Sequence, residues 1–137
     1  MSTVDAPALI DSNVLLRYIT RDPVEMAKRA AQIIDSHESL LLSELVLVEA
    51  AYVLASVYGV RRPAIVDALI DFVQKQNIKP AGLPKPLVLE ALGLCRNSKR
   101  YSFTDAFLWA QARDLGTRIY SFDERLPHDG VEIVGME

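Results

Sequence analysis

The chain has 137 residues, of which 50% are hydrophobic and 24% are charged, and this composition fits one globular domain over residues 1–137. A formal net charge of −3 argues against a strongly basic protein that binds nucleic acid through charge alone, and a single cysteine, Cys95, excludes an intrachain disulfide. No apolar run is long enough to span a membrane and the first residues do not resemble a signal peptide, so we expect a cytoplasmic protein without membrane contact.

Short apolar runs alternate with helical patterns along the chain. The run 8–10 ends abruptly at Asp11, which predicts a buried strand and then a helix over 14–19. In chain order, the pattern then predicts a helix over 24–36, a strand over 39–42, helices over 44–58 and 64–76, an ambiguous segment over 78–83 that is a candidate strand, helices over 84–95 and 105–115, and strands over 118–122 and 131–134.

The expected strands are short and wholly apolar, and most are separated by helices. Both features indicate an α/β fold with a parallel sheet that helices cover on both faces. In such sheets, ligands bind beyond the carboxyl ends of the strands. Polar side chains that follow the strands are therefore the candidates for a functional site.

Four carboxylates stand at such positions or within a buried helix. Asp11 follows the first strand and Asp123 follows a later one, while Asp105 opens a mostly apolar helix. Glu49 is the only charged residue between Leu45 and Ala55, so we expect a buried carboxylate that needs a partner or a metal. Each has a structural alternative: a helix or turn cap for the three aspartates, and an ion pair or a solvent-facing helix side for Glu49.

The other polar candidates are weaker. The loop ahead of Asp105 carries Arg96, Lys99 and Arg100, which form either a solvated loop or a patch that holds phosphate beside the acidic residues. We interpret the pair Arg61-Arg62 as solvated. Four residues are expected in the core: Tyr52, Cys95, Phe107 and Trp109.

Four segments of the sequence resemble, in order and spacing, the motifs of PIN-domain nucleases. They are Ile-Asp-Ser-Asn-Val-Leu-Leu-Arg-Tyr (10–18), Ser-Glu-Leu-Val-Leu-Val-Glu-Ala-Ala-Tyr-Val-Leu (43–54), Phe-Thr-Asp-Ala-Phe-Leu-Trp-Ala-Gln-Ala (103–112) and Tyr-Ser-Phe-Asp-Glu-Arg-Leu (120–126). The length of the chain and the residues of these four motifs are most similar to the VapC toxins of prokaryotic toxin–antitoxin pairs. The stretch 83–102 departs from the family pattern, which leaves substrate choice open.

The resemblance implies a three-layer α/β/α fold with a central parallel sheet and a metal-dependent ribonuclease activity. It implies that an acidic quartet, Asp11, Glu49, Asp105 and Asp123, binds Mg²⁺ or Mn²⁺, with Asn13 and Ser121 in support. A carboxylate set without His or Cys independently suits these cations, which prefer oxygen ligands and lower the pKa of bound water. RNA as substrate, a cognate antitoxin as partner and a homodimer are further implications.

Three alternatives remain at this point. Another α/β phosphoryl enzyme is disfavoured, because Asn13 stands where a dehalogenase-type phosphatase needs a second Asp and because the sequence has no glycine-rich phosphate loop. A PIN-like binding module without activity would not need four acids. A stand-alone RNA-processing nuclease would share the site of a toxin.

Overall fold

The strands form two separate parallel sheets. The computed structural model describes residues 7–135. The first sheet has the order β1-β2-β3, built from β1 (Ala8–Leu9), β2 (Leu40–Leu42) and β3 (Ile78–Pro80), with Leu9 opposite Leu41 and Leu41 opposite Lys79. The second sheet pairs β4 (Ile119–Tyr120) with β5 (Ile133–Val134).

Six helices connect these strands in the described part of the chain, and their ends follow the local sequence. They are α1 (Ser12–Thr20), α2 (Val24–Ser36), α3 (Glu44–Ser56), α4 (Arg62–Val73), α5 (Lys85–Leu94) and α6 (Phe103–Leu115). Ser43 caps α3 by accepting a hydrogen bond from the backbone of Leu45. Gly116 ends α6 with φ 64°, a left-handed conformation that glycine adopts without steric cost.

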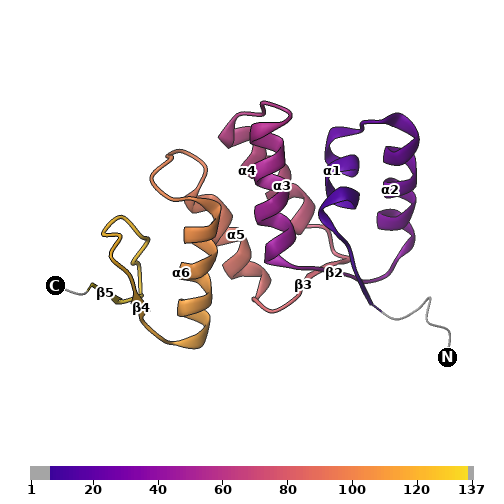
Figure 1. Ribbon diagram of the computed structural model, residues 1–137. Coiled ribbons are helices and arrows are strands. Elements are labelled where there is room, and N and C mark those ends of the chain that lie inside the picture. The colour runs from indigo at the N-terminus through magenta and orange to yellow at the C-terminus, as the bar shows by residue number, and fades with distance from the viewer. Residues whose placement is uncertain (1–6, 136–137) are drawn as a thin grey trace.

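The helices form a row with the sheets at its margin (Figure 1). α1 and α2 pack together at one end, α3, α4 and α5 occupy the middle, and α6 lies at the other end beside β4 and β5. One hydrophobic core nevertheless runs through the row, from Ile10 to Val131. No helix among residues 7–135 is long and apolar enough to cross a membrane.

The α/β class and the parallel strands are confirmed, and the segment 78–83 does contain a strand. Helix 24–36 has the predicted bounds, whereas most other elements begin or end a few residues away from them. The main difference is that β4 and β5 do not join β1-β2-β3 in one central sheet. Strands of two or three residues carry too little pattern to predict which strands pair.

Candidate functional site

Asp11 links the end of β1 to the start of α1. Its extended backbone (φ −92°, ψ 176°) makes it the N-cap, and its Oδ1 accepts a hydrogen bond of 3.1 Å from the backbone N–H of Val14. Asp11 and Asn13 are both exposed. The capping alternative is therefore correct, and it leaves the exposed side chain open to a ligand.

Glu49 is exposed, so the expectation of a buried carboxylate is wrong. The same side of α3 presents Leu45, with 76% of its surface exposed, and Tyr52, with 72% exposed. Tyr52 is thus not a core residue either. α3 is apolar on most sides because it packs against α1, α4 and α6, and its remaining apolar side faces solvent.

A groove of about 560 Å³ separates α3 from α6. Glu49 lines it from α3, and Thr104, the neighbour of Asp105, lines it from α6. Gln111 of α6 donates a hydrogen bond to Glu44 across the same groove. The two helices therefore bring the second and third acidic motifs to one cleft.

Asp105 takes part in a reciprocal cap at the start of α6. Its Oδ2 accepts from the backbone N–H of Ser102 (3.2 Å), while Ser102 Oγ accepts from the backbone N–H of Asp105 (3.0 Å). The side chain of Asp105 is half-buried. Like Asp11, this carboxylate has a structural role at a helix start.

Asp123 follows β4 in a turn fixed by side-chain contacts. Ser121 Oγ accepts from the backbone N–H of Asp123 (2.9 Å), and Asp123 Oδ1 accepts from the backbone N–H of Arg125 (2.9 Å). The Arg125 guanidinium lies 3.5 Å from the same oxygen. Ser121 therefore positions the turn that carries Asp123.

The four carboxylates do not converge on one point within the described chain. No three side chains of His, Cys, Asp or Glu in residues 7–135 gather closely enough to hold a metal ion. Glu49 lines the α3–α6 groove, whereas Asp105 is only the neighbour of the groove-lining Thr104. Asp123 follows β4, a strand that lies beyond α6 (Figure 1). The donor chemistry fits Mg²⁺ or Mn²⁺, but the arrangement in one chain does not gather the donors, and the metal assignment of all four stays a prediction.

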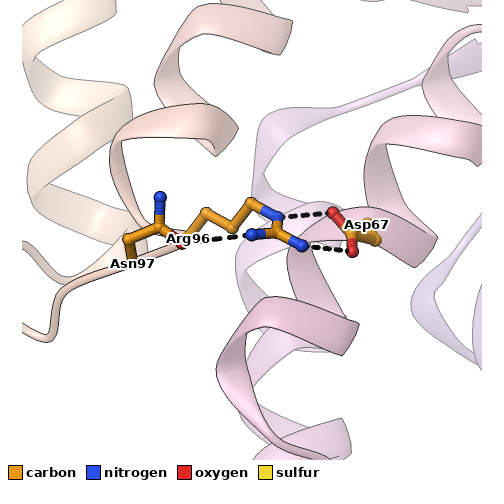
Figure 2. A network of polar contacts seen from close by, with 3 residues as sticks. All are labelled: Asp67, Arg96 and Asn97. Carbon is orange, nitrogen blue, oxygen red and sulfur yellow. Dashed lines mark hydrogen bonds and ion pairs between the residues drawn. The ribbon is translucent and has the colours of Figure 1, made fainter.

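Only part of the basic loop ahead of α6 is available to bind phosphate. Arg96 makes a two-point contact with Asp67 of α4, with Nε 2.8 Å from Oδ1 and Nη2 2.9 Å from Oδ2, and it also contacts Asn97 (Figure 2). This contact lowers the pKa of Asp67 and raises the pKa of Arg96. Lys99 and Arg100 are exposed and remain the better candidates for binding phosphate.

Arg62 has a structural role that the sequence did not reveal, and its interpretation as a solvated residue is wrong. Its Nη1 donates to the backbone oxygens of Cys95 (3.2 Å) and Tyr101 (3.0 Å), and its guanidinium lies 5.0 Å from the ring centre of Phe103. Arg62 thereby fixes the loop that leads into α6. The partners are 33 and 39 residues away in sequence for the two hydrogen bonds, so no local pattern could have indicated them.

Comparison with known proteins identifies a family. The family model of the PIN domain matches residues 8–130, which include all four acidic residues and most of the fold. No curated protein matches the chain.

Proposed function

The chain belongs to the PIN domain family, and from this premise we propose that it is a ribonuclease that depends on a divalent metal. PIN domains form a nuclease superfamily that generally uses divalent metals. In this proposal Asp11, Glu49, Asp105 and Asp123 supply oxygen ligands to Mg²⁺ or Mn²⁺, with Asn13 and Ser121 in support. RNA is the proposed substrate.

The observation that carries this proposal is the family match over residues 8–130, which contains all four carboxylates. None of the four is fully buried, so solvent, metal and substrate have access to each. The carboxylates of Asp11, Asp105 and Asp123 each accept a hydrogen bond from a nearby backbone N–H, so local contacts orient them before any ligand binds.

Within the family, the residues of the four motifs support the more specific proposal that the chain is the toxin of a toxin–antitoxin pair. An antitoxin would block the enzyme by placing a basic side chain against one or more of these carboxylates, because Asp and Glu form charge-assisted hydrogen bonds with Arg or Lys. The product of the neighbouring gene, co-purified without a tag, should bind the chain and abolish cleavage. A neighbour that does neither would favour a stand-alone RNA-processing nuclease.

Cleavage of RNA by purified protein tests the activity itself. We expect cleavage in Mg²⁺ or Mn²⁺, loss of cleavage with excess EDTA, and recovery when metal is restored. Full activity in EDTA would contradict the metal requirement. Metal binding without cleavage of any RNA would favour a PIN-like binding module.

A further inference from the structure

A pocket of about 580 Å³ lies where the turn into α4 meets the loop that leads into α6. One wall comes from the end of α3 and the start of α4, and the other wall comes from the loop and the first residue of α6. Figure 1 shows the α3–α4 turn and the α5–α6 loop on the same side of the row of helices. The pocket therefore joins segments that are about 40 residues apart in sequence, as the hydrogen bond from Arg62 to Tyr101 also shows.

Three cationic side chains line this pocket, which is called the basic pocket below: Arg61, Arg62 and Lys99. None of the residues that line it is Asp or Glu. The ion pairs formed within residues 7–135 use other cations, so none of them neutralises these three charges. Like charges in a hollow repel one another and raise the local concentration of anions.

Arg61 stands where a positive charge does not help the fold. The start of a helix favours acidic side chains, because the helix dipole places partial positive charge there. Arg61 is the N-cap of α4 but forms no side-chain capping bond, and no acidic residue lies in the first turn. A residue that goes against the local rule in this way is expected at a binding site.

The basic pocket combines one fixed cation with two exposed ones. Arg62 is half-buried, and its Nη1 is held by the backbone oxygens of Cys95 and Tyr101, so its guanidinium loses little freedom when a ligand binds. Arg61 and Lys99 are exposed and can reach a ligand from either wall. Guanidinium and ammonium groups both form charge-assisted hydrogen bonds with phosphate oxygens.

The basic pocket adjoins the α3–α6 groove. Phe103 lines the pocket, and the next residue, Thr104, lines the groove. On α3, Ala55 lines the pocket and Glu49 lines the groove, six residues earlier, which is about 9 Å along the helix axis. A short stretch of one nucleic-acid strand can therefore lie in both at once.

We propose that the basic pocket holds a backbone phosphate of the RNA while a neighbouring part of the same strand lies in the α3–α6 groove. Arg61 and Arg62 thereby join Lys99 as residues that position the substrate. A phosphate contact fixes the register of the strand without reading its bases. This inference rests on the proposed function and adds to it a binding site outside the acidic residues.

RNA binding in EDTA tests the pocket without relying on cleavage. The probe is a fluorescein-labelled single-stranded RNA, and its anisotropy is measured at several salt concentrations. Arg61→Gln combined with Lys99→Gln should weaken binding and lower the slope of log affinity against log salt by about 0.7 for each phosphate no longer neutralised. Arg62 is left intact because it also fixes the loop before α6.

A control variant removes the same charge elsewhere. Lys28→Gln combined with Lys79→Gln changes two exposed cations on α2 and β3, outside the lining of the basic pocket, and should leave the slope near that of the wild type. Arg61→Lys with Lys99 intact keeps the charge and should retain most of the affinity. If the control variant loses as much affinity and slope as the pocket variant, only overall charge matters and the proposal is overturned.

A scan of neutral linkages locates the phosphate. A set of the same RNA carries one methylphosphonate, an uncharged linkage, at a different position in each member. Wild-type protein should lose most affinity at one position, and Arg61→Gln combined with Lys99→Gln should show no further loss there. If the variant is as sensitive as the wild type at every position, its side chains contact no phosphate and the proposal is overturned.

Inorganic phosphate separates an RNA site from a site for a free anion. If the pocket variant binds RNA as the wild type does but no longer gains thermal stability from inorganic phosphate, the pocket binds a free anion and the proposal is wrong. If wild-type protein binds RNA through the pocket but cleaves none, the proposed function fails and the pocket stands. Wild-type protein that binds no RNA would overturn both.

Discussion

Three of the candidate carboxylates serve the backbone as well as the proposed chemistry. Asp11 caps α1, Asp105 completes the cap of α6, and Asp123 accepts from the backbone of its own turn. Asn accepts the same hydrogen bonds through its side-chain oxygen and is an equally good N-cap. An Asp→Asn change therefore removes charge while it keeps the local structure.

Asp11→Asn or Asp105→Asn should reduce RNA cleavage by at least one to two orders of magnitude, because loss of a direct metal ligand should exceed the 10–100-fold cost of losing a supporting residue. Melting temperatures should stay close to that of the wild type. Kinetic assays in Mn²⁺ together with thermal melts check both points.

Asp11→Ala provides the matched control. It removes the cap as well and should cost about 1 kcal/mol of stability, or a few degrees in melting temperature. An Asp→Asn variant that cleaves RNA at the wild-type rate would remove that residue from the site.

Cys95 is buried at the end of α5, and burial raises the pKa of its thiol from 9.0 to about 11. The folded state thus favours the neutral thiol. The resulting stability is fully present below pH 9 and is lost as the pH rises toward 11. Wild-type stability should fall more steeply over this range than that of Cys95→Ala, measured by urea unfolding.

The thiol should also resist alkylation at pH 8 in the folded protein and react only after unfolding. Rapid labelling of native protein would show that the loop over Cys95 opens readily.

At the scale of elements, the helices were largely predictable because caps, prolines and glycines mark their ends. Which side of a helix is covered was less predictable. α3 is apolar almost all round, so its sequence alone indicated burial of Glu49 and Tyr52, and only the packing of α1, α4 and α6 shows which side remains open. The structural role of Arg62 depends in the same way on partners far away in sequence.

The basic loop should contribute unequally to RNA binding. Lys99 and Arg100 are exposed, with Arg100 over the ring of Tyr101, whereas Arg96 forms an ion pair with Asp67. Lys99→Ala with Arg100→Ala should weaken binding and lower the slope of log affinity against log salt by about 0.7 for each phosphate that the variant no longer neutralises, as for single-stranded nucleic acid.

Arg96→Ala should leave that slope nearly unchanged. Asp67→Asn removes the negative charge that pairs with Arg96, so it should leave the salt slope unchanged or make it steeper. Filter binding at several salt concentrations measures all three variants, and an equal effect of Arg96→Ala would show that Arg96 leaves Asp67 to bind RNA.

At the scale of the molecule, one connected core and two separate sheets coexist within residues 7–135. The alternation of short apolar strands with helices predicted the α/β class, since that pattern depends on the whole chain. The division of the sheet was not predictable, because the pairing of two-residue strands is decided by where α5 and α6 place them.

The continuous core predicts that residues 1–137 unfold as one domain. Trp109 is almost fully buried in α6, and its Nε1 donates to the backbone oxygen of Asp129, so its fluorescence reports the part of the molecule around β4 and β5. Circular dichroism reports all six helices. Because the buried residues of α5 and α6 belong to the same cluster as those of α1 and α3, the two signals should change together.

Parallel urea titrations at one protein concentration measure this coincidence. A fluorescence transition that precedes the loss of helix would show that the C-terminal part unfolds by itself. In that case Arg62→Ala, which removes the contacts that fix the loop before α6, should widen the gap between the two transitions. The alternative outcome is that the fluorescence and circular dichroism curves coincide in the wild type and also in the variant, with both of the variant's curves shifted to lower urea. That result would show that Arg62 stabilises the domain as a whole.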